Sequence, residues 1–169
     1  MDESIPGVIR QDDWFALMDP AWNPDEQPVP PTELMVGGWP LNRNGQVGPF
    51  RPNPGYRPSA ATVPTDPIDA VLHRIAAGAD HLGDELTATI GDCVVSVACD
   101  EQGRPVIGTS PDGIACIIVA TAELQKTGTG LPRWRSIHGA NLTQVAPPQV
   151  DIFLNPAGVV PFRLARTAG

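Results

Sequence analysis

The sequence GGWPLNRNGQVGPFRPNPGYRP, from Gly37 to Pro58, decides the fold that this chain predicts. An Asn-Gly dipeptide at residues 44 and 45 lies between two apolar residues. This dipeptide favours the two positive φ values of a type I′ turn, so we expect a hairpin with arms at 34–41 and 46–50. The five prolines between 51 and 64 remove backbone donors, so that segment should wrap over a surface rather than form a helix or a central strand.

A helix start follows this proline-rich segment. Asp66 can cap a helix that has Pro67 as its first residue and Asp69 as its third, and Gly78 can end it. Between these signals the apolar residues recur at the spacing of one helical face, at Ile68, Val71, Leu72 and Ile75. The sequence therefore predicts an amphipathic helix over 67–77 that packs on a sheet.

The remaining elements are predicted from alternation and turn residues. Residues 114–120 are apolar on both faces, which is typical of a central strand. Strands at 93–99 and 105–108 should form a three-stranded meander with it. Thr121 can cap a short helix that runs through Gln125. The other expected elements are a helix at 83–90, one or two helical turns at 141–145, and strands at 150–154 and 159–164.

The N-terminal part is less regular. Residues 1–11 are polar and contain proline and glycine, so we expect a flexible arm. Trp14 to Met18 is long enough for one buried strand, with a single helical turn as the alternative. We predict an α+β fold in one domain, with a mostly antiparallel or mixed sheet, short helices on one face and an extended Pro-rich N-terminal region. The expected parts are the arm (1–11), a Trp/Pro-rich segment packed on the main domain (12–66), and the main domain (67–169).

Charge is distributed unevenly along the chain. The net charge is −8 for 169 residues, and residues 1–35 contribute −7 of it through eight carboxylates and one arginine. Residues 36–64 hold three arginines and no acid. Such a surface repels nucleic acid and anionic lipid and favours basic partners, although a solvated acidic terminus or a match to the arginine-containing stretch would also explain it.

The sequence contains no pattern that predicts catalysis or a cofactor. Cys93 and Cys99 would lie about 20 Å apart on one strand, too far for a disulfide, and the three cysteines read as reduced, buried side chains. No cysteine and histidine spacing indicates zinc, and the histidines at 73, 81 and 138 fall in separate contexts. We therefore expect no enzyme, no metal and no cofactor. No signal peptide or membrane span is recognisable, so we expect a cytoplasmic protein.

Several short motifs resemble a known family. The first half contains WFALMDPAW (14–22), GGW (37–39), FRPNPGY (50–56) and Asp66-Pro67, which resemble actinobacterial type VII secretion system-associated proteins. The second half contains DEQGRP (100–105), SPDG (110–113), VAT (119–121) and LNP (154–156), and it is similar to the SseB N-terminal domain. The resemblance implies a cytoplasmic accessory protein of a secretion locus, and it implies no catalytic residue.

The residues that we expect to contact a partner lie in the tryptophan-rich and proline-rich regions. Tryptophan is the commonest interface anchor, and a pre-ordered proline-rich coil loses little entropy on docking. Three of the four tryptophans could instead fasten the N-terminal segment to its own sheet, with Trp22 as the ring most expected to stay accessible. The candidate partner-binding residues are Trp22, Arg51, Arg57, Trp14, Asp25 and Glu26.

Two functions from different classes follow. The first is a non-enzymatic accessory protein that binds a secreted effector or a machinery component of a type VII secretion locus, as a chaperone or an immunity protein. The second is a small-molecule-binding regulatory domain, with a pocket bordered by residues 127–135 and the turn at Asn155-Pro156. A hydrolase whose residues meet only in space is the remaining alternative.

Overall fold

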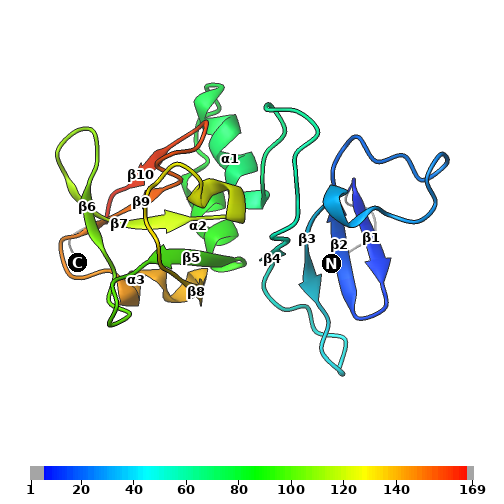
Figure 1. Ribbon diagram of the computed structural model, residues 1–169, viewed down its shortest axis with the longest axis horizontal. Helices are drawn as coiled ribbons and strands as arrows, with labels where there is room; N and C mark the ends of the chain where they lie inside the picture. The colour runs from blue at the N-terminus through cyan, green and yellow to red at the C-terminus, as the bar shows by residue number, and fades with distance from the viewer. Residues whose placement is uncertain (1–5, 167–169) are drawn as a thin grey trace.

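The computed structural model describes residues 6–166, which form two β-sheets and three short α-helices. This is an α+β fold, and its second sheet is mixed. Figure 1 shows the N-terminal sheet at one end of the molecule and the larger sheet with its helices at the other. Among the helices of the described part, none is long and apolar enough to cross a membrane.

The N-terminal sheet has the order β1-β2-β3-β4 and is antiparallel throughout. Its strands are β1 (Val8–Gln11), β2 (Trp14–Met18), β3 (Met35–Pro40) and β4 (Arg51–Pro52). Of the two alternatives for 14–18, the strand is therefore observed. Strand β1 differs from the flexible arm that composition predicted, because it pairs along its full length with β2. Met1 to Ile5 of that expected arm lie outside the described residues.

The hairpin exists, but its turn and second arm differ from the prediction. Asn42 N–H donates to the Gln46 carbonyl at 3.0 Å, which leaves a three-residue loop. Gly45 has φ +73°, whereas Asn44 is not among the residues with positive φ, so the turn is not type I′. Beyond the turn only Val47 forms an isolated bridge, and the strand begins at Arg51. The asparagine side chain at 42 accepts from two loop amides and stabilises this longer loop.

The larger sheet has the order β10-β9-β7-β5-β8, and β6 also pairs with β7. Its strands are β5 (Val94–Ala98), β6 (Ile107–Thr109), β7 (Ala115–Ala120), β8 (Trp134–His138), β9 (Asp151–Leu154) and β10 (Phe162–Leu164). Strand β7 is central, as its two apolar faces predicted. The predicted meander is wrong in one respect, because β5 and β6 both pair with β7 and meet each other only through the bridge Cys99–Pro105.

Helices α1 (Pro67–Ala76), α2 (Gly83–Gly91) and α3 (Leu142–Val145) pack on one face of the larger sheet. The helix start was predicted correctly, since the Asp66 carboxylate accepts from the amides of Ile68 and Asp69. Apolar residues of all three helices share one buried cluster with Val95 and Val97 of β5. Those two valines alternate with Val94 and Ser96, so the latter face the side without helices.

Phe50 joins the two sheets. Its amide donates to the carbonyl of Asp92, and its carbonyl accepts from the amide of Val94, which gives a parallel bridge to the start of β5. The Phe50 ring is fully buried and lies edge-on to Trp39, with the ring centroids 4.9 Å apart. The main chain next to β4 therefore fixes the N-terminal sheet against the larger one, as seen at the centre of Figure 1.

Candidate functional site

A cleft of about 580 Å³ lies between the two sheets. On one side it is lined by Ala16 of β2, Gly38 of β3 and Arg51 of β4, which are register partners on neighbouring strands. On the other side it is lined by Ser96 of β5 and Ser136 of β8, which also face each other in register. Small side chains on both sheets leave the space, because larger ones at these positions would fill it.

Larger side chains border this floor. Trp14 is 40% exposed and lies at the N-terminal side of the cleft. On the other side, Lys126 forms a 2.7 Å ion pair with Glu123, and its Nζ lies 5.8 Å from the ring centroid of Trp134. Within residues 6–166 Arg51 has no ion-pair partner. The cleft thus presents an aromatic surface and one cation that is not neutralised.

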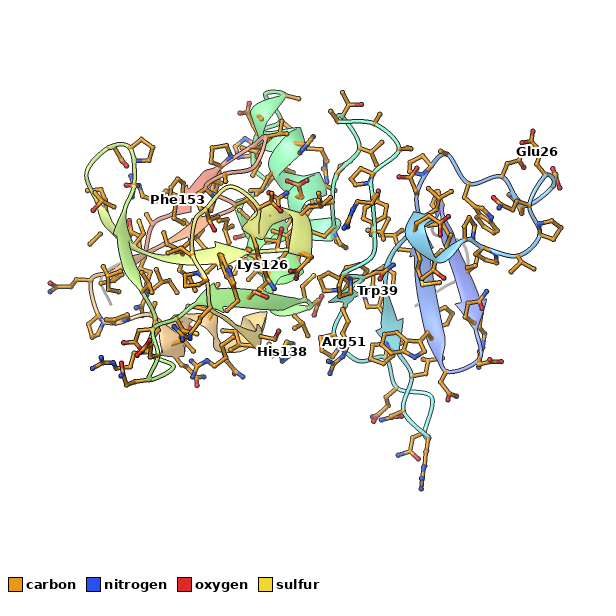
Figure 2. All side chains as sticks on the ribbon, in the orientation of Figure 1. Glu26, Trp39, Arg51, Lys126, His138 and Phe153 are labelled. Carbon is orange, nitrogen blue, oxygen red and sulfur yellow. The ribbon has the colours of Figure 1, made fainter. Side chains whose placement is uncertain are left out.

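Figure 2 shows Arg51 and Trp39 between the two parts of the molecule, with Lys126 and His138 on the neighbouring part and Glu26 at the far end. The predicted partner-binding residues are therefore divided. Trp14 and Arg51 line the cleft, whereas Arg57 borders an adjoining hollow that shares Glu123 and Lys126 with it. The Arg57 guanidinium donates to the carbonyls of two neighbouring residues, Pro54 and Tyr56, at 3.2 and 2.8 Å.

Trp22, Asp25 and Glu26 lie on the loop between β2 and β3, away from the cleft. Trp22 is half-buried, and its indole N–H donates to the Gln27 carbonyl at 3.0 Å within that loop. The expectation that Trp22 is the accessible ring is wrong, because Trp14 is the exposed tryptophan. Both acids are exposed, so the loop forms a separate acidic surface.

A buried polar network lies directly behind the cleft. Thr121, at the cleft wall, donates its hydroxyl proton to Asp66 Oδ2 at 2.6 Å and accepts from the Asn155 side chain at 2.9 Å. Thr65 donates to the same carboxylate oxygen at 2.8 Å and accepts from the Gln125 side chain at 2.9 Å. The network ties the start of α1 to the ends of β7 and β9, so the expectation that Thr121 caps a helix is wrong; the 3₁₀ turn Glu123–Lys126 has no side-chain cap.

Two carboxylates meet in this network. Burial, and then the charge of Asp69, raise the pKa of Asp66 from 3.8 to about 6. Asp69 is 2% exposed, its Oδ2 accepts from the Thr65 amide at 2.9 Å, and its Oδ1 has no hydrogen-bond partner. The Nε2 atom of His73 lies 3.5 Å from that Oδ2. These groups are closed off from the cleft by Thr121, and their hydrogen bonds serve to hold the fold together.

The cleft itself offers little for catalysis. Its one carboxylate, Glu123, is held by Lys126, and no histidine or cysteine is among the residues that line it. In the part of the chain that the structure describes, no group of three His, Cys, Asp or Glu side chains could hold a metal ion. The arrangement is suited to binding, through shape, one aromatic wall and a free guanidinium.

Sequence reasoning missed most of the cleft residues. Ser96 is the only polar residue in the apolar strand β5, and that interruption is the one local signal that could have indicated an open face. Lys126 is the single lysine, but nothing in its neighbours indicates the cleft. A hollow was expected between 127–135 and Asn155-Pro156, and one of about 350 Å³ is present there, lined by Thr129, Leu131 and Pro156 among others.

Comparison with family models, curated proteins and solved structures gives no match to this chain.

Proposed function

We propose that this chain is a non-enzymatic binding protein that holds an extended segment of a partner protein in the cleft between its two sheets. The cleft carries this proposal, because it is formed by small side chains on two facing sheets and is open along its length at Ser96 and Ser136. Extended segments bind in such surfaces through main-chain hydrogen bonds and side-chain pockets. Trp14 and Arg51 supply an anchor and a charge for that segment.

The motifs in the sequence lead us to propose the partner's origin. A product of a type VII secretion locus, either a secreted effector or a machinery component, would be held by this protein as a chaperone or an immunity protein in the cytoplasm. The acidic loop with Trp22, Asp25 and Glu26 would add a second contact, to a basic surface of the same partner, and would accelerate encounter.

Co-purification with the products of neighbouring genes tests this proposal. Each product is produced together with this chain and analysed by size exclusion at low and moderate salt. We expect one of them to co-elute at both salt concentrations. If every product elutes separately at low salt, where electrostatic attraction is strongest, the proposal fails.

A second function is favoured by the size of the cleft, since about 580 Å³ is within the range of small-molecule sites. A regulatory domain that binds a metabolite would use the same cleft. A thermal-shift screen separates the two functions, because a ligand at 100 times its Kd adds about 2.7 kcal/mol to the free energy of unfolding.

A further inference from the structure

Strand β8 is an edge strand whose outer side is free to pair. The amide of Gly139 donates to the Cys93 carbonyl, and the amide of Cys99 donates to the Arg133 carbonyl, so these residues mark the hydrogen-bonded pairs at the two ends of the β5–β8 ladder. Alternation along an antiparallel pair then directs the main-chain groups of Arg135 and Ile137 towards β5. The N–H and C=O groups of Trp134, Ser136 and His138 point away from the sheet.

This edge is less protected than the others. Natural sheets keep edge strands short or interrupt them with proline. The described edge strands β1, β4, β6 and β10 have four, two, three and three residues, and β4 contains Pro52. Strand β8 has five residues and contains no proline, which makes it the longest free edge in the described part of the fold.

The two faces of β8 differ. Ser136 lines the cleft, and Trp134 and His138 share its face by alternation. Arg135 projects from the opposite face and is exposed, as is Arg133 just before the strand. Arg133 lies 3.5 Å from Glu101, whereas Arg135 has no ion-pair partner within residues 6–166. A strand added to β8 would therefore place alternate side chains towards the cleft and the others beside arginine.

We propose that β8 pairs with an extended acidic segment of the partner protein, which adds a sixth strand to the run β10-β9-β7-β5-β8. The segment alternates apolar residues, which face the cleft beside Ser136, with carboxylates, which face Arg135. A second copy of this chain is a poorer occupant, because pairing two β8 strands would bring like charges together. This inference rests on the proposed function and specifies how the partner segment is held.

The probe is a seven-residue peptide of alternating valine and glutamate with blocked ends. Amide hydrogen exchange of the full chain is followed by NMR with the peptide at millimolar concentration. We expect exchange at the amides of Trp134, Ser136 and His138 to slow by about tenfold or more, while Arg135 and Ile137 are protected in both states. A matched peptide with lysine in place of glutamate should give no such protection.

N-methylation of the peptide tests the main-chain hydrogen bonds. Only alternate residues of an added strand bond to β8, so methylating one alternate set should abolish protection and methylating the other set should preserve it. In the protein, Ser136→Pro removes an outward N–H without removing a hydrogen bond to β5 and should abolish protection at Trp134 and His138. Arg135→Glu should do the same for the glutamate peptide and should permit protection by the lysine peptide.

Absence of slowed exchange at these three amides with the glutamate peptide overturns the inference, as does equal protection by the lysine peptide. Failure here is distinct from failure of the proposed function. A secretion-locus product that co-elutes but leaves the β8 amides unprotected would refute strand addition alone. Protection by the peptide without any co-eluting product would leave the edge as a strand-binding site and refute the secretion role.

Discussion

The hydroxyl of Thr121 donates a 2.6 Å hydrogen bond to the carboxylate of Asp66, a residue 55 positions earlier in the chain. Asp66 already caps α1, so one carboxylate both starts a helix and binds the end of the central strand. Thr121 also lines the cleft. The same contact therefore fixes the helices on the sheet and holds one wall of the candidate binding site.

Replacing Thr121 with valine should destabilise the protein by about 1.5–3 kcal/mol, because the buried carboxylate loses a hydrogen bond while the side-chain shape is preserved. Urea unfolding at pH 7 gives the free energy. Thr87→Val is the matched control, since the Thr87 hydroxyl bonds an exposed carbonyl of its own helix; it should change stability by no more than about 0.5 kcal/mol. Equal losses in the two variants would show that the network contributes nothing special.

Asp66→Asn should change how stability depends on pH. The pKa of Asp66 is raised from 3.8 to about 6 in the folded state, so folding takes up a proton between these values. Its contribution to stability is greatest below pH 3.8 and is lost as the pH rises towards 6. Asparagine still caps the helix but does not titrate. From pH 4 to 7 the variant should therefore gain about 3 kcal/mol relative to the native protein in urea unfolding. A difference that stays constant over this range would contradict the assignment.

Two glycines should respond oppositely to alanine. A Cβ at Gly139 would lie 1.8 Å from the Ile90 carbonyl oxygen, so Gly139→Ala must displace the main chain where α2 meets the 3₁₀ turn Gly139–Asn141. We expect a loss of about 1–3 kcal/mol. Gly91, in α2, has nothing within 4 Å, so Gly91→Ala should stabilise by about 0.4–1 kcal/mol. Melting temperatures that fall in both variants would contradict this packing.

Local signals predicted the elements whose cause is local. Asp66-Pro67 specified the start of α1, because a cap and a first-turn proline act within a few residues. The apolar run at 114–120 predicted the central strand, because only burial on both faces explains it. All three cysteines are free, as spacing and apolar context predicted.

The rest depends on partners distant in the chain. Strand β1 consists of mixed residues and forms only because β2 lies beside it. Strand β8 has alternate exposed residues and gave no clear signal until its pairing with β5 is known. The cleft arises where Gly38 and Ser96, on different sheets, face the same space, and no spacing in the sequence relates them. Trp14 and Arg51 were predicted for their chemistry, not for this position.

Charge reversal at Arg51 tests the central claim most directly. Arg51 lines the cleft, whereas Arg43 is an exposed arginine in the hairpin loop, and the two come from the same acid-free stretch. The affinity of the co-eluting secretion-locus product is measured by calorimetry for Arg51→Glu and Arg43→Glu. If the cleft holds an acidic segment of the partner, Arg51→Glu should weaken binding by about tenfold or more and Arg43→Glu should leave it nearly unchanged. Equal affinities for the two variants, or a greater loss with Arg43→Glu, would contradict the claim that the cleft is the binding site.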